Sequence, residues 1–190
     1  MSPRGNPQRR DIAAARDATM ATRRRSSNRT VYRLAAHACR DLAPLLLQEG
    51  FHPAAVTRAL ECTRFVDALQ PIHAFDWRRP ILFFARLRRV AGITLGAYVF
   101  LAETSLLQRK ALLAHEAVHV AQIETQGLLL FLIRYVTEWI GKRVRGMNDE
   151  DAYLALRDEV QARAVELKVA YAVAARKIDP STPWLDPLDD

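Results

Sequence analysis

The feature that most constrains this chain is the pentapeptide H-E-x-x-H at residues 115–119, which lies in an apolar stretch with helical spacing. Side chains four residues apart lie on one face of a helix, with Cβ atoms about 5–6 Å apart. His115 and His119 can therefore bind one metal ion at the Zn–N distance of about 2.0–2.1 Å. Glu116 follows the first histidine and lies beside the ion, where it can take a proton from a water. The sequence predicts a helix that carries a zinc site, with Glu116 as general base.

A third protein ligand is needed, because zinc hydrolases typically use three and leave one coordination position to water. The other histidines all precede the motif and have no partner at ligand spacing (His37, His52 and His73). Among the carboxylates after the motif we favour Glu159, which is expected in the middle of a long helix. Small side chains share its face and permit close approach to the motif helix (Ala152, Ala155 and Ala162). Asp158 is the main rival, although it points about a quarter-turn away.

Three helices are expected from the motif region onward. Ser105 and Gln108 form a capping-box pattern, so the motif helix is expected over residues 106–125, with Gly127 as its stop signal. A second helix is expected over residues 128–142. Its apolar run is too short to span a bilayer and contains charged residues, so we expect it to be buried.

The third helix is expected to start after Asn148 as N-cap and to extend to residue 177. Before the motif, apolar spacing predicts a helix from residue 31, while residues 54–69 fit a helix or a strand. Residues 81–84 and 93–101 read as two strands joined by a turn at Ala91-Gly92, which predicts a β-hairpin.

The second of these strands contains Thr94, Gly96 and Tyr98. It is either an ordinary core strand or an edge strand that binds an extended peptide by β-addition. Gly96 in mid-strand indicates a bulge or a close approach of another backbone. The predicted fold class is α+β, mainly helical: a zincin-like active-site helix preceded by a β-hairpin and followed by two further helices.

Charge divides the chain into a basic tail and a nearly neutral body. The formal net charge is +7, and residues 1–30 contribute eight arginines against two aspartates, which leaves +1 for residues 31–190. We expect residues 1–30 to be a disordered tail, residues 31–178 a single zincin-like domain, and residues 179–190 an exposed C-terminal tail. The basic tail is either a solvated leader or a contact for nucleic acid or an anionic surface.

The compartment is predicted from the cysteines and from the N-terminal segment. Cys39 and Cys62 do not form a C-x-x-C motif, and two cysteines do not make a disulfide framework, so a reducing compartment is expected. The N-terminal segment has no apolar core of the secretory type, and no segment is expected to span a membrane. We therefore expect a cytoplasmic protein, or one exported without a recognisable signal peptide.

Taken together, residues 93–162 resemble the eCIS core domain, a bacterial metallopeptidase-type domain associated with extracellular contractile injection systems. The residues that carry the resemblance are, in chain order, Ile93-Thr94-Leu95-Gly96, Tyr98-Val99-Phe100, the run from Leu112 to Gln122, Gly127-Leu128, Phe131, Arg134, Tyr135, Tyr153, Glu159 and Ala162. The resemblance implies a gluzincin-like site, with two histidines from one helix, a glutamate from a later helix, and a water.

These observations predict a metallopeptidase that uses one Zn²⁺, held by His115, His119 and Glu159, to hydrolyse a peptide or protein substrate. Tyr135 and Tyr153 either stabilise the oxyanion by hydrogen bonding or simply pack between helices. The alternative is a catalytically silent zinc-binding module for assembly or interaction, associated with a contractile injection or toxin system. A third class, a protein that binds nucleic acid or a membrane surface, would work through residues 1–30.

Overall fold

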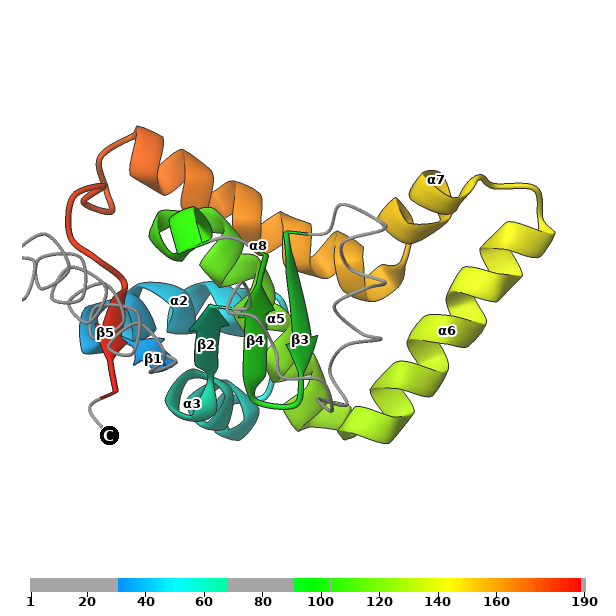
Figure 1. Cartoon of the computed structure of the whole chain (residues 1–190), viewed down its shortest axis with the longest axis horizontal. Helices are drawn as coiled ribbons and strands as arrows, with labels where there is room; N and C mark the ends of the chain where they lie inside the picture. The colour runs from blue at the N-terminus through cyan, green and yellow to red at the C-terminus, as the bar shows by residue number, and fades with distance from the viewer. Residues whose placement is uncertain (1–30, 68–90, 103, 189–190) are drawn as a thin grey trace, which may run out of the picture.

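The computed structural model describes residues 31–67, 91–102 and 104–188, and the predicted strand at 81–84 and basic tail at 1–30 lie outside them (Figure 1). The strands are β1 (Val31–Leu34), β2 (Arg64–Asp67), β3 (Gly92–Leu95), β4 (Tyr98–Leu101) and β5 (Leu185–Pro187). The helices are α2 (Ala36–Gln48), α3 (Pro53–Cys62), the 3₁₀ helix η1 (Thr104–Gln108), α5 (Lys110–Gln126), α6 (Leu128–Val144), α7 (Asp149–Leu154) and α8 (Arg157–Ala174). A small sheet among many helices confirms the predicted α+β, mainly helical class.

The sheet has the strand order β3-β4-β2-β1-β5. All neighbouring strands pair antiparallel except β2 and β4, which are parallel. β3 therefore lies at an edge of the sheet within the described part of the chain. This edge lies beside α5, so the strand before the motif and the motif helix are neighbours in space.

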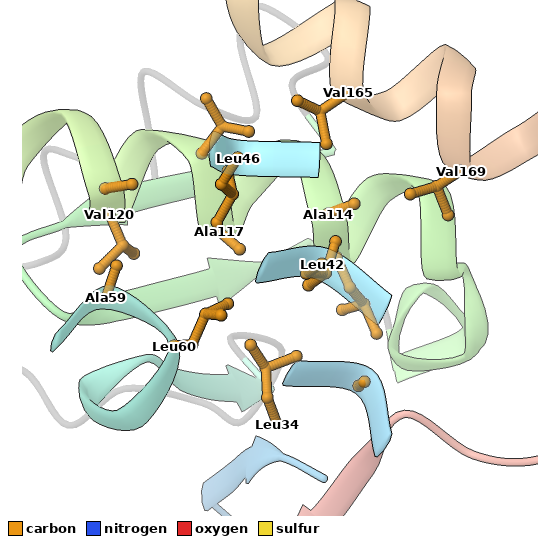
Figure 2. Close-up of a cluster of buried hydrophobic side chains, with 14 of the residues drawn as sticks. Leu34, Leu42, Leu46, Ala59, Leu60, Ala114, Ala117, Val120, Val165 and Val169 are labelled. Carbon is orange, nitrogen blue, oxygen red and sulfur yellow. The ribbon is translucent and has the colours of Figure 1, made fainter. Parts of the chain in front are cut away.

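The core forms where α5 lies between the sheet and α8. Side chains from α2, α3, α5 and α8 meet in one cluster, which Figure 2 shows around Leu42, Ala114 and Val165. Every residue of α5 from Leu113 to Ile123 is buried. A helix that is covered on all sides needs no single apolar face, so polar residues on α5 must find partners inside the protein.

A hairpin precedes the motif helix, but it forms within residues 92–101, with its turn at Gly96-Ala97 between β3 and β4. The predicted pairing of residues 93–101 with residues 81–84 lies outside the described residues. Gly96 has φ of 62°, in the left-handed region that glycine adopts at little cost. The expected single strand over residues 93–101 is therefore two short strands, and the alternation of apolar residues did not reveal the reversal.

The N-terminal prediction is also partly wrong, because residues 31–34 form a strand. β1 pairs with β2 on one side and with β5 on the other, and α2 begins only at Ala36. The ambiguous stretch at residues 54–69 separates into α3 and β2. Both partners of β1 are distant in sequence, so its local apolar spacing could not distinguish strand from helix.

The helix after the motif helix has its predicted limits to within two residues, but it is not a buried helix. α5 begins at Lys110, four residues later than predicted, because residues 104–108 form η1, and it ends before Gly127 as predicted. α6 presents many exposed apolar side chains to solvent among the described residues (Leu129, Leu130, Leu132, Ile133, Val136, Ile140 and Val144). Figure 1 shows α6 and α7 as an arm that extends away from the sheet. Within the described ranges, none of the helices has the length and apolar character needed to cross a membrane.

The predicted third helix is two helices, which changes the setting of Glu159. Leu156 adopts an extended conformation between α7 and α8, so Glu159 lies in the first turn of α8 and not in mid-helix. Ala152 and Ala155 do not share its helix. Ala162 does, and it is buried against the core.

The segment after residue 179, predicted to be an exposed tail, is partly packed. Trp184 is only 2% exposed, and β5 extends the sheet by pairing with β1. The backbone N–H of Ala35 also donates to the carbonyl of Trp184 at 2.9 Å. The C-terminal segment is therefore a part of the domain that fixes the start of α2.

We predict that Trp184→Ala lowers the free energy of unfolding by about 3–5 kcal/mol, the usual cost of truncating a large buried aromatic side chain. Chemical denaturation is the measurement, with Pro183→Ala, at the exposed neighbouring position, as the control. Equal stability of the two variants would show that residues 179–188 do not contribute to the core.

Candidate metal centre

Three buried side chains converge between α5 and α8. Nε2 of His115 lies 3.2 Å from Nε2 of His119, and each of these nitrogens lies 3.4 Å from one oxygen of Glu159. All three ligand atoms lie within 4.8 Å of one another. Helical spacing places the two imidazoles on one face of α5, and the start of α8 adds the carboxylate from across the interface.

Hydrogen bonds on the far side of each ring fix the tautomer of both histidines. Nδ1 of His115 donates to Oε2 of Glu166 at 3.0 Å, and Nδ1 of His119 donates to Oε1 of Gln122 at 2.8 Å. Gln122 is itself oriented, because its amide donates to the carbonyl of Asp158 and to Oε1 of Gln161. A neutral histidine with its proton on Nδ1 presents the Nε2 lone pair to the centre of the site.

The residues therefore fit a metal cation. Two nitrogen lone pairs and a carboxylate facing one another are stable only when a proton or a cation lies among them. Oε2 of Glu159 is buried and has only long polar contacts, at 3.4 Å to Nε2 of His115 and 3.8 Å to Nη2 of Arg163, as expected of an atom that can complete its bonding through an ion. The buried group of His115, His119 and Glu159 can hold a metal ion, and the bonds to Glu166 and Gln122 are of the kind that orient metal-ligating histidines.

The pKa shifts of the three residues also indicate that the cluster favours a positive charge at its centre. Burial alone would lower the pKa of His115, but hydrogen bonds to Glu159 and Glu166 outweigh it and raise that pKa to about 10. Burial alone would also lower the pKa of His119, but its hydrogen bond to Glu159 and the negative charges of Glu159 and Glu116 together raise it. Despite its own burial, the pKa of Glu159 is lowered by its bonds to the two histidines. The cluster thus binds protons strongly when no cation competes.

Tyr135 and Tyr153, predicted as oxyanion stabilisers or packing residues, both belong to the surroundings of Glu159. The hydroxyl of Tyr135 donates to Oε1 of Glu159 at 2.8 Å. Burial first, and then the charge of Glu159, raise the pKa of both phenols, so both stay protonated. Tyr135, on α6, therefore orients the Glu159 carboxylate.

Asp158, the alternative third ligand, does not face the histidines as Glu159 does. Asp158 turns away from the histidines and forms an ion pair with Arg134 on α6. It is not a member of the convergent group. The adjacent residues 158 and 159 thus have different roles, because side chains one residue apart point about 100° apart on a helix.

Glu116, the predicted general base, is buried beside the edge strand β3. The hydroxyl of Thr94 donates to its Oε2 at 2.7 Å. A Cβ built on Gly92 would lie only 2.7 Å from its Oε1, so this glycine leaves the space that the carboxylate fills. β3 therefore holds the Glu116 side chain in one place.

The three residues predicted to form a substrate-binding strand separate in the structure. Thr94 lies on β3 and binds Glu116, Gly96 forms the turn, and Tyr98 lies exposed at the start of β4, where its ring stacks on Phe100. Only Thr94 lies in direct contact with a predicted site residue. The edge position of β3 remains compatible with β-addition of a peptide.

Two contributors were not assigned a role from the sequence. Glu166 lies seven residues, or two turns, after Glu159 and so shares its face of α8, and Gln122 lies three residues after His119 on α5. Helical spacing from the ligands was the available signal for both. It was not decisive, because many other polar residues have similar spacings.

Comparisons of this chain with protein-family models, with curated proteins and with solved structures find no match. The eCIS resemblance accordingly stays a prediction from the sequence.

We predict about one tightly bound metal ion per chain in the wild type, and loss of that ion in His119→Ala and in Glu159→Ala. Asp158→Asn is the matched control, because it changes a carboxylate adjacent to Glu159 that binds Arg134, and it should retain the ion. Elemental analysis of the purified proteins is the measurement. Metal loss in Asp158→Asn but not in Glu159→Ala would assign the third ligand to Asp158.

We also predict that Gly92→Ala destabilises the fold by about 1–3 kcal/mol, the usual cost of overpacking a filled site. The reason is the contact of the new methyl group with Glu116, so the cost should shrink in a Glu116→Ala background and persist in Glu116→Gln. A double-mutant cycle by chemical denaturation measures this coupling. Equal costs in all three backgrounds would contradict the proposed contact.

Proposed function

We propose that the protein is a zinc-dependent metallopeptidase that hydrolyses peptide bonds in a peptide or protein substrate. The observation that carries this proposal is the convergence of His115, His119 and Glu159 with Glu116 directly beside the first ligand. Two imidazoles and one carboxylate are a ligand set of catalytic zinc sites that leave one position open. One Zn²⁺ per chain is the expected cofactor.

Each residue then has a chemical role. When bound, Zn²⁺ supplies a Lewis acid that polarises a carbonyl group and makes water more acidic. Glu116 accepts the proton of the attacking water and delivers it to the leaving nitrogen. Thr94 donates a hydrogen bond that keeps this carboxylate in place, and Tyr135 does the same for Glu159. A substrate in extended conformation would pair with the edge strand β3.

A catalytically silent zinc module for assembly or interaction is the second candidate. The observation that favours it is the burial of His115, Glu116, His119 and Glu159 among the described residues. A buried metal stabilises a fold without catalysis, since binding energy then contributes to folding. Stoichiometric zinc without hydrolysis of any peptide would support this function over the enzyme.

Other predictions about the cell biology rest on the sequence alone. They are the resemblance to the eCIS core domain with its contractile injection systems, the bacterial cytoplasm or signal-free export, and contact of residues 1–30 with nucleic acid or an anionic surface. Each adds context to the peptidase proposal, and none is required by it.

We predict that Glu116→Gln abolishes hydrolysis, because an amide cannot accept the proton, and that zinc is retained because the three ligands are unchanged. The measurement is cleavage of a fluorogenic peptide library, with zinc content determined on the same preparations. Rates should fall at least about 10²-fold. Hydrolysis by the variant at the wild-type rate would refute the role of Glu116 as general base.

A further inference from the structure

A second candidate site lies on the arm, in a pocket between α6 and the start of α8. Its volume is about 410 Å³. It is lined by Arg134, Thr137, Glu138, Gly141, Arg145 and Arg157. Pockets of about 300–1,000 Å³ are the usual size of small-ligand and side-chain sites.

The pocket carries an excess of positive charge. Three arginines line it, and the one acidic residue, Glu138, is already engaged: its Oε1 accepts the backbone N–H of Arg157 at 3.1 Å and pairs with Lys142 Nζ at 3.1 Å. Arg134 pairs with Asp158 through Nη2, while its Nε has no hydrogen-bond partner. Within residues 31–67, 91–102 and 104–188, the guanidinium groups of Arg145 and Arg157 have no carboxylate partner. The pocket therefore offers unused donors to an anion.

The absence of a side chain at Gly141 leaves space in this pocket. Glycine inside a helix costs about 0.5–1 kcal/mol relative to alanine. A Cβ built on Gly141 would meet no atom within 4 Å, so close packing does not require glycine here. The missing side chain instead leaves open space on the pocket wall.

We propose that this pocket binds carboxylate side chains of an acidic polypeptide. Guanidinium groups match carboxylates in a planar, bidentate geometry, and such pairs are stronger than neutral hydrogen bonds. Nucleic acid fits less well, because single-stranded nucleic acid is bound along an extended basic groove with aromatic stacking platforms. None of the six residues that line this compact pocket is aromatic.

The inference rests on the proposed function in one respect, namely that the acidic polypeptide is a substrate of the same site. Arg134 lines the pocket and binds Asp158, whose neighbour Glu159 is a predicted zinc ligand. The pocket is thus connected with the candidate metal ligands through Arg134, Asp158 and the adjacent Glu159 on α8. The pocket would select substrates with acidic residues outside the cleaved bond.

The test measures binding without cleavage, on full-length Glu116→Gln protein, by fluorescence anisotropy of a fluorescein-labelled hexaglutamate peptide at low salt. Hexaglutamine is the uncharged control peptide. Arg145→Gln and Arg157→Gln should each weaken hexaglutamate binding by about tenfold, because each removes one charge-assisted contact. Gly141→Leu should weaken it by a similar factor by filling the pocket, while Gly141→Ala should retain binding.

Arg143→Gln is the matched control for charge. Arg143 lies on the same helix, is paired with Asp149 at 2.7 Å and does not line the pocket, so its loss should leave binding unchanged within about twofold. Circular dichroism checks that each variant is folded. If Arg143→Gln and Arg145→Gln weaken hexaglutamate binding equally, the peptide is attracted non-specifically by positive charge and the proposed pocket is refuted.

The other outcomes separate this inference from the peptidase proposal. If hexaglutamate binding depends on Arg145 and Gly141 but the wild type hydrolyses no peptide, the carboxylate-binding pocket is supported and the peptidase proposal is refuted. Absence of hexaglutamate binding, or unaltered binding in Gly141→Leu, would overturn the pocket even if wild-type protein hydrolyses other peptides. Tight binding of inorganic phosphate or of an oligonucleotide in its place would overturn the assignment to carboxylates.

Discussion

The structure depends on the contact between α5 and α8, where charged groups must satisfy one another out of reach of water. His115, His119 and Glu159 are all buried, and an isolated buried charge costs several kcal/mol. The interface is therefore stable only as a complete set, with a cation or protons at its centre and Glu166, Gln122 and Tyr135 around it. The same contacts therefore hold α5 against α8 and arrange the candidate metal ligands.

Small apolar residues make this close contact available. Ala114 and Ala117 on α5, and Ala162 on α8, are fully buried in the same core cluster. Figure 2 shows Val165 and Val169 of α8 beside Ala114 of α5. Side chains of this size let two helix backbones approach closely, which brings Glu159 within reach of both imidazoles.

The sequence predicted the parts of this arrangement that depend on local spacing. The motif helix, its end at Gly127 and the choice of Glu159 over Asp158 follow from helical periodicity and from the ligand preferences of zinc. Periodicity gave the wrong structure where segments distant in sequence pack together. Residues 31–34 were predicted to be helical, but they pair with β2 and β5. Trp184 was predicted to lie in an exposed tail, but other segments of the chain bury its side chain. Glu159 does converge with the two histidines, although its stated setting, the middle of a long helix, was wrong. Nothing in the local pattern of residues 149–177 marks Leu156 as the break.

Two adjacent residues on α6 connect the arm with the candidate metal site. Arg134 and Tyr135 follow one another on α6, and they bind Asp158 and Glu159, which follow one another on α8. Because the two contacts use consecutive residues on each helix, the position of α6 along α8 also determines whether Tyr135 can orient the Glu159 carboxylate. A shift of α6 by one residue would break both bonds and leave Glu159 and Asp158 buried without these partners, at a cost of about 1–3 kcal/mol for each unsatisfied group. Movement of α6 along α8 would therefore break the contacts of Arg134 with Asp158 and of Tyr135 with Glu159 together. The same four side chains connect the pocket on α6 with the buried cluster between α5 and α8.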